Sequence, residues 1–242
     1  MNRILFEPAE ISHGLVTVGD ARAAHILDVL HGEVGDTLKT GEINGLVGTG
    51  EIVAVSGGDV TLRVCHDQAS RAPWVDLILA PPRPRVLKRL LPQLATLGVG
   101  RIVLVGARKV EKDFWGATLL KEANYRPLLV DGLMQAGTSA LPEIMVRRGF
   151  RAFVRDELDG LFPRATRLVA HPYGTKACAC AREPNQDASL LLAVGPEGGW
   201  TDEELAALEE KGFSRFSLGP RILRTDTAVI ALLAILGQTW DG

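Results

Sequence analysis

The chain has 242 residues, of which 46% are hydrophobic and 23% charged, and its formal net charge at pH 7 is -2. This length is sufficient for a full α/β core with a small second domain, and the composition is that of an ordinary globular protein. The overall charge gives no indication of nucleic-acid binding, so any RNA contact has to come from local basic patches. The longest apolar run, Ala228 to Leu236, is too short for a membrane-spanning helix, which needs about 20 residues.

The three cysteines, Cys65, Cys178 and Cys180, are odd in number and sparse, so no disulfide framework is predicted. Free thiols are typical of a reducing compartment, and residues 1–8 contain neither a long apolar core nor a cleavage pattern. We therefore expect a cytoplasmic protein. His171 with Cys178 and Cys180 would supply only three zinc ligands, without the paired spacing of structural zinc sites, so we expect no metal.

Short β-rich runs separated by glycines characterise the first 72 residues. A helix is predicted over 20–30, and the segment 56–59, Ser-Gly-Gly-Asp, is typical of a hairpin turn. The predicted strands cover residues 36–39, 50–55 and 59–64. The polar, proline-terminated stretch 67–73 is a candidate linker. These features predict a small β-barrel domain over residues 1–72.

Strands alternate with helices in the rest of the chain, residues 73–242. The predicted strands cover residues 77–80, 101–105, 143–146, 167–170, 190–194 and 216–218. A helix with one apolar face is predicted over 86–97, with Pro92 inside it as a source of a kink. This alternation favours an α/β domain with a parallel sheet covered on both faces. Ligands of such sheets bind beyond the carboxyl ends of the strands.

A glycine-rich loop, Gly195-Pro196-Glu197-Gly198-Gly199, follows the apolar strand 190–194 directly. Thr201 and Glu204 then have the spacing of a capping box, which predicts the start of a helix. Glycines let a ligand approach the backbone closely, but the carboxylates at this helix start disfavour a phosphate ligand. We expect a ligand with cationic or neutral polar groups. The alternative is a tight strand-to-helix turn that binds nothing.

A second motif, Leu218 to Ala228, follows a short strand and opens a last helix that extends to about Trp240. This helix is apolar on nearly every face, so we expect it to pack against both its own sheet and a second subunit in a homodimer. The alternative is a core helix buried within one chain.

The two motifs together, G-P-E-G-G and then L-G-x-R-I-L-R-T-[DE]-T-A, resemble the SPOUT-class 16S rRNA uracil-N3 methyltransferase family. The resemblance covers the whole chain. It implies a PUA-like β-barrel RNA-binding domain over residues 1–72 and an α/β methyltransferase domain over 73–242 that ends in a trefoil knot. It further implies S-adenosylmethionine as cofactor, ribosomal RNA of the small subunit as substrate, and a homodimer.

Three loops hold the cofactor in that family, and each has a counterpart in this sequence. The cofactor-binding residues implied are Ala170, His171, Pro172, Gly195, Pro196, Glu197, Gly198, Gly199, Leu218, Gly219, Ile222, Leu223 and Thr225. We therefore expect Gly198→Val to crowd the cofactor pocket. The chain departs from the usual family pattern at Pro84, Thr96 and Met134, near the expected RNA-facing side, which leaves the target nucleotide open.

Local groups of basic residues are the candidates for contacts with RNA phosphates. The residues predicted to bind RNA are Arg83, Arg85, Arg108, Lys109, Lys112 and Arg221. A further basic group comprises Arg147, Arg148, Arg151 and Arg155. For any one group the alternative is a solvated surface that binds nothing.

N3 of uracil is a weak acid, so its methylation needs removal of a proton or stabilisation of the resulting anion. Glu197 and Asp226 are the carboxylates within the motifs that can act as general base, and Arg224 or Arg221 can stabilise negative charge. The alternative is that Asp226 only caps the last helix and Arg224 only pairs with it.

Two other classes of function remain open from the residues alone. One is a non-catalytic RNA-binding protein that has kept the fold. The other is a methyltransferase that acts on a small molecule, which the basic groups disfavour. A methyltransferase of the same class acting on a different RNA nucleotide is also compatible with the sequence.

Overall fold

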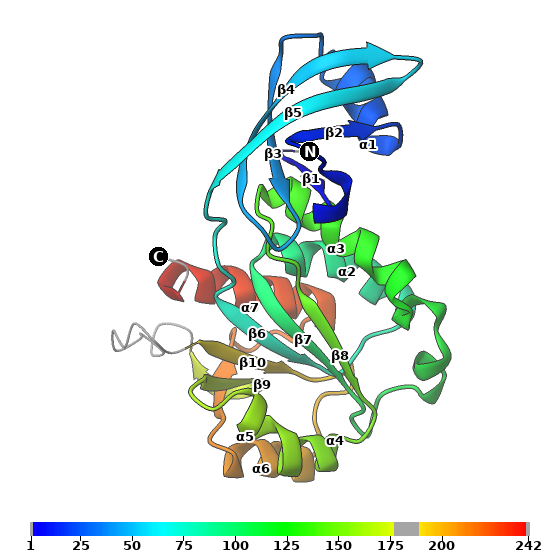
Figure 1. Ribbon diagram of the computed structural model, residues 1–242. Coiled ribbons are helices and arrows are strands. Elements are labelled where there is room, and N and C mark those ends of the chain that lie inside the picture. Colours follow the sequence, from blue (N-terminus) through cyan, green and yellow to red (C-terminus); the bar gives the residue numbers. More distant parts are fainter. Residues whose placement is uncertain (1, 177–188, 241–242) are drawn as a thin grey trace. The chain divides into compact units, whose positions relative to one another are not determined.

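The structure, a computed structural model, describes residues 2–176 and 189–240 (Figure 1). The chain forms two compact units. The first unit consists of residues 1–72 and 130–141, and the second consists of residues 73–129 and 142–242.

The first unit contains a five-stranded sheet in the order β1-β3-β4-β5-β2. Its strands are β1 (Ile4–Phe6), β2 (Leu15–Val18), β3 (Thr37–Glu42), β4 (Val47–Ser56) and β5 (Asp59–Gln68). All neighbours are antiparallel except β1 and β3, which are parallel. Gly57 and Gly58 join β4 to β5 with φ angles of +62° and +94°, which confirms the predicted hairpin turn.

The helix predicted over 20–30 is present as α1 (Ala21–Ala24) followed by a π-helical turn, His25–Val29. Asp20 caps α1, because its side chain accepts a hydrogen bond from the backbone N–H of Arg22. Ile26 on this helix packs against the sheet in a core that also contains Phe6 and Leu62. A short 3-10 helix, Pro8–Glu10, lies between β1 and β2.

Hydrogen bonds attach residues 130–141 to the first unit. The backbone N–H groups of Asn2 and Arg3 both donate to the carbonyl oxygen of Met134, at 2.9 and 3.1 Å. The Ser139 hydroxyl, which is fully buried, donates to the carbonyl of Gly45 at 2.7 Å. Each of these contacts joins residues more than 90 positions apart, which is why sequence patterns give no sign of them.

The second unit is built on a six-stranded sheet in the order β11-β9-β10-β6-β7-β8. Its strands are β6 (Val75–Leu79), β7 (Val99–Val105), β8 (Glu143–Arg147), β9 (Thr166–Lys176), β10 (Leu190–Val194) and β11 (Ser214–Ser217). Every neighbouring pair is parallel, so the predicted α/β class and parallel sheet are confirmed. All five residues of β6 and of β10 are buried, as expected for central strands covered on both faces.

Helices cover both faces of this sheet, with α4, α5 and α6 on one face and α2 and α7 on the other (Figure 1). The helices are α2 (Pro84–Thr96), α3 (Glu122–Ala136), α4 (Phe150–Ala152), α5 (Leu158–Leu161), α6 (Asp202–Glu210) and α7 (Thr225–Trp240). Three short helical turns are Lys112–Gly116, Thr118–Leu120 and Phe153–Glu157. Pro92 lies inside α2, which continues to Thr96.

The last helix, α7, is only partly covered by its own chain. Val229, Leu232, Leu233 and Leu236 are buried, whereas Ile235 is 38% exposed. None of the helices in the described part of the chain combines the length and the apolar character that crossing a bilayer takes.

Leu62→Ala should lower the free energy of unfolding by about 2–5 kcal/mol, because it leaves a cavity in the core of the first unit. Leu62 is fully buried on β5, whereas Leu15 on the neighbouring β2 is 41% exposed, so Leu15→Ala should cost less than about 1 kcal/mol. Urea unfolding followed by circular dichroism compares the two variants. Equal losses would show that this core is not packed as described.

Candidate active site

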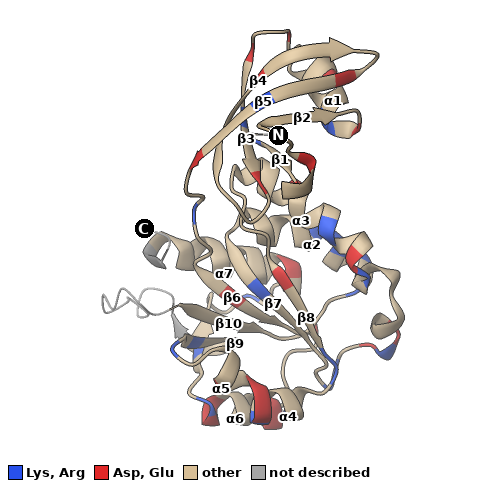
Figure 2. Cartoon of the chain, in the orientation of Figure 1, with Lys and Arg blue, Asp and Glu red and all other residues tan. Residues whose placement is uncertain are grey.

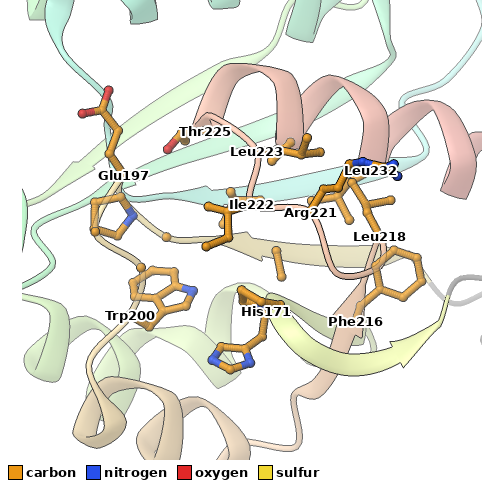
Figure 3. Close-up of a pocket in the computed structure, with 18 of the residues that line it drawn as sticks. His171, Glu197, Trp200, Phe216, Leu218, Arg221, Ile222, Leu223, Thr225 and Leu232 are labelled. Carbon is orange, nitrogen blue, oxygen red and sulfur yellow. The ribbon is translucent and has the colours of Figure 1, made fainter.

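A cavity of about 350 Å³ lies at one edge of the parallel sheet, over β9, β10 and β11 (Figure 3). This volume is within the range of cofactor-binding pockets. Its walls are residues 170–172, the loop after β10 and the segment after β11, and the first turns of α7 complete it. Residues 170–172 were expected in a loop, but they lie within β9, where its pairing with β11 shifts register. All residues that the family resemblance implies for the cofactor line this one cavity, although they come from segments 170–172, 195–199 and 218–225.

Five further residues line the cavity and were not predicted. They are Val194, Trp200, Phe216, Ala228 and Leu232. Their apolar side chains lie at strand ends and at helix starts, where the sequence pattern predicts core packing and gives no separate signal for a pocket. Trp200 also packs on the ring of Phe150 with the ring centroids 5.5 Å apart, so one wall of the cavity is continuous with the hydrophobic core.

The loop between β10 and α6 has the local structure that the sequence predicts. The Thr201 hydroxyl accepts from the N–H of Glu204, and the Glu204 carboxylate accepts from the N–H of Thr201, so the capping box is confirmed. Gly199 has φ +69°, a conformation that side-chain-bearing residues rarely adopt. At the other end of α6, the N–H of Phe213 donates to the carbonyl of Leu208 and so ends the helix.

Ser217 connects two walls of the cavity. Its hydroxyl donates to the carbonyl oxygen of Pro172 at 2.8 Å and accepts from the N–H of Gly219 at 3.0 Å. The side chain is buried, so these hydrogen bonds are shielded from water. Ser217 therefore holds residues 170–172 of β9 against the segment after β11. Sequence patterns give no sign of this residue, since its partner is 45 positions away.

Glu204 connects the glycine-rich loop to the loop after β7. Its second carboxylate oxygen accepts from the backbone N–H of Arg108 at 2.6 Å, and the residue is buried. Beside it, the ammonium group of Lys109 donates to the carbonyl of Gly198 at 2.7 Å. A buried carboxylate that accepts several N–H bonds fixes both loops in one arrangement.

This arrangement corrects the expectation for Gly198→Val. A Cβ atom on Gly198 would meet Cδ of Lys109 at 2.9 Å, so the first neighbour of a larger side chain is Lys109 and not the space of the pocket. One of the three N–H donors of the Lys109 ammonium group bonds to the Gly198 carbonyl, which leaves two donors for another partner.

The two candidate bases differ in their surroundings. Glu197 is exposed on the loop after β10, and its carboxylate points away from the rings of Trp200 and His171 (Figure 3). Asp226 lies at the start of α7, where one carboxylate oxygen accepts from the N–H of Thr227 at 2.9 Å. Its other oxygen is 3.8 Å from the guanidinium of Arg89, so the pairing with Arg224 considered above is not what the structure contains.

The basic residues predicted to bind RNA are all in the second unit, and most of them form no ion pair with another described residue. Arg83 forms an exposed ion pair with Glu111 at 3.2 Å. Within the described residues, no ion pair engages Arg85, Arg108, Lys112, Arg221 or Arg224. By contrast, three arginines of the further basic group pair with acidic residues, namely Arg147 with Glu157, Arg151 with Glu203, and Arg155 with Asp156.

Figure 2 shows acidic residues gathered on α6, the helix that carries Glu203. The basic group that includes Arg151 is thus partly neutralised, which favours a solvated surface there. For the zinc hypothesis, Cys178 and Cys180 lie outside the described residues, and the described residues contain no cluster of three metal-ligating side chains.

A model of the RNA methyltransferase domain family matches residues 70–237, which is more than half of the chain. The chain belongs to this family. A relative from Treponema pallidum named "Ribosomal RNA small subunit methyltransferase E" is 30% identical over 242 residues, covering 98% of this chain and 90% of the relative.

Solved structures of two relatives have the same fold over nearly the whole length. A methyltransferase from Legionella pneumophila, in complex with the bound cofactor SAM, is 26% identical with a TM-score of 0.76 and covers 98% of this chain and 97% of its own. A ribosomal RNA small subunit methyltransferase E from Neisseria gonorrhoeae is 24% identical with a TM-score of 0.78. The match covers 99% of this chain and 98% of that protein.

Glu204→Gln should loosen the connection between the two loops of this methyltransferase domain. A glutamine has only one acceptor oxygen, so either Thr201 or Arg108 would lose its partner, at a cost of about 1–3 kcal/mol in the free energy of unfolding. Amide hydrogen exchange should become faster at Arg108. Glu203→Gln is the matched control, since Glu203 is the exposed neighbour and its replacement should change stability by less than about 0.5 kcal/mol. The same loss in both variants would contradict the bridging role.

Proposed function

We propose that this protein uses S-adenosylmethionine to methylate N3 of a uridine in 16S ribosomal RNA of the small subunit. The observation that carries the proposal is the convergence of three segments, which the family resemblance assigns to the cofactor, around one cavity of about 350 Å³. The name of the Treponema pallidum relative and the cofactor bound to the Legionella pneumophila relative support the substrate and the cofactor.

The residues around the cavity suit this cofactor. The backbone of segments 195–199 and 218–223 would hold its polar edges, and Val194, Phe216 and Leu232 would contact its ring. The acidic start of α6 suits a ligand that carries positive charge and no phosphate. When bound, S-adenosylmethionine supplies an electrophilic methyl group.

The chain has to hold the uracil next to that methyl group and take the proton from N3. Glu197 or Asp226 is the general base, and Arg224 or Arg221 stabilises the negative charge on the uracil oxygens. Arg89 would hold the Asp226 carboxylate in place, since its guanidinium is 3.8 Å away. Positioning supplies much of the remaining rate enhancement.

The exposed cations would bind the RNA backbone. Arg85, Arg108, Lys112 and Arg221 have no acidic partner among the described residues, and Arg83 and Lys109 retain free donors. The contacts of Arg85, Arg108, Lys112 and Arg221 would be to phosphates and would carry little sequence information. A PUA-like β-barrel of residues 1–72 would add a further RNA-binding surface, next to a methyltransferase domain of residues 73–242.

The same proposal includes a trefoil knot at the C-terminus, a cytoplasmic location and a homodimer. The partly uncovered α7 supports the dimer, since Ile235 is exposed next to a fully buried row that includes Leu233. A second subunit would bury this remaining apolar surface.

Asp226→Asn and Glu197→Gln each remove a candidate base and keep the shape of the side chain. Whichever carboxylate takes the proton, its variant should lose roughly 10²-fold or more in the rate of methyl transfer. Affinity for S-adenosylmethionine should be retained in both. Single-turnover methylation against pH, with calorimetry for the cofactor, measures this. If both variants keep the wild-type rate and pH profile, neither carboxylate is the base. If the wild-type protein does not bind the cofactor, the proposed function is wrong.

Lys112→Gln should weaken RNA binding and reduce the slope of log affinity against log salt by about one unit, because one phosphate contact is lost. The rate with saturating RNA should hardly change. Arg155→Gln is the control, since Arg155 is exposed and paired with Asp156. Filter binding to 16S rRNA at several salt concentrations gives the slopes. Identical slopes for Lys112→Gln and the wild type would show that Lys112 does not contact an RNA phosphate.

A further inference from the structure

A second, smaller hollow of about 40 Å³ lies next to the cofactor cavity on the same edge of the sheet. It lies between the loops that follow β6, β7 and β10, whereas the larger cavity lies over β9, β10 and β11. Pro196 and Glu197 line both hollows. The loop after β10 is therefore a wall shared by the two, and a ligand in the small cleft would lie directly beside a ligand in the large one.

More than half of the residues that line the cleft are prolines, valine or phenylalanine. Three prolines of the loop after β6, Pro81, Pro82 and Pro84, line it together with Val110 and the buried ring of Phe114. Apolar walls of this kind suit a planar heterocycle, which buries its faces there and leaves its polar edge for the charged residues. The small volume favours a single pyrimidine ring.

The rim carries one free acceptor and two sets of donors. Glu197 has no hydrogen-bonding partner among the described residues, and its carboxylate points away from the larger cavity (Figure 3). Lys109 is fixed by its bond to the carbonyl of Gly198, and two of its donors remain. Arg83 is held through Nε by Glu111, so the other N–H groups of its guanidinium remain available.

These groups are complementary to the edge of uracil. Uracil presents an acceptor at O4, a donor at N3 and an acceptor at O2. A carboxylate can accept the N3 donor, and two cations can donate to the oxygens. Cytosine has an unprotonated N3 and an amino group at C4, so the carboxylate would face an acceptor and one of the cations would face a donor.

We propose that this cleft binds the uracil ring of the target nucleotide, with Glu197 accepting the hydrogen bond from N3 while Arg83 and Lys109 donate to the ring oxygens. The inference rests on the function proposed above. It assigns the proton acceptor to Glu197, and it assigns the donors to the uracil oxygens to Arg83 and Lys109 in place of Arg221 or Arg224. Asp226 does not line the cleft and is already paired with Arg89. The cleft thus gives the enzyme a means of rejecting cytosine before methyl transfer.

The test uses the full chain saturated with S-adenosylhomocysteine, into which uridine 5′-monophosphate or cytidine 5′-monophosphate is titrated. Backbone amide shifts in ¹H–¹⁵N spectra report where each nucleotide binds. We expect shifts in Arg83 and residues 109–111, with the uridine nucleotide bound roughly fivefold or more tightly than the cytidine nucleotide. Glu197→Gln should bring this ratio close to one, and Arg83→Gln should weaken uridine binding. Arg155→Gln should leave both affinities unchanged.

The possible failures are distinguishable. If S-adenosylhomocysteine does not bind to the wild-type protein, the proposed function fails. If it binds but the nucleotides perturb other residues, or both bind equally well to the wild type, the assignment of the cleft is overturned and the function stands. The assignment is also overturned if Asp226→Asn loses the preference for the uridine nucleotide while Glu197→Gln keeps it. The carboxylate facing N3 would then be Asp226.

Discussion

The parallel direction of all six strands in the second unit is the constraint on which the site depends. Parallel strands bring their carboxyl ends to one edge of the sheet, so the loops after β6, β7, β10 and β11 lie there, with residues 170–172 of β9 beside the last two. Because the central strands β6 and β10 are buried along their whole length, the functional groups next to them are confined to the segments that follow. Both hollows follow from this arrangement, and the loop after β10 separates them.

Loops at a sheet edge bind well only if they are held in place, and two buried polar side chains do this. Ser217 joins residues 170–172 of β9 to the segment after β11, and Glu204 joins the loops after β7 and β10. A buried carboxylate or hydroxyl that lost its partners would be costly, so each bond stabilises a single loop arrangement. The cavity is therefore preorganised, so ligand binding costs less conformational entropy than it would with mobile loops.

The parts of the fold that the sequence predicts are those with local signals. The apolar runs of β6 and β10, the capping box at Thr201 and the glycine turn between β4 and β5 all lie within a few residues of their causes. Helix α3 was missed, because Pro127 inside it is a typical helix breaker and Leu129 and Leu133 are buried by tertiary packing. The short strands β1 and β2 carry too few residues for a clear alternation.

The sequence predicts which residues form the site, but it does not predict which of them contact one another. The motifs locate the three cofactor segments, but the contact of Arg108 with Glu204 spans 96 positions and has no local signature. For the same reason, the sequence assigned Lys109 only to RNA and gave no sign of Arg89 near Asp226, whereas the structure places Lys109 against Gly198 and Arg89 beside Asp226.

The central claim, that this protein methylates N3 of a uridine in small-subunit ribosomal RNA, is tested most directly in the RNA. Methylated nucleotides in 16S rRNA would be mapped by mass spectrometry in a strain that lacks the gene and in the same strain complemented with the wild-type protein. The account predicts that one N3-methyluridine is absent without the gene and returns on complementation. An unchanged set of methylated nucleotides, or the loss of a mark on another base, would contradict it.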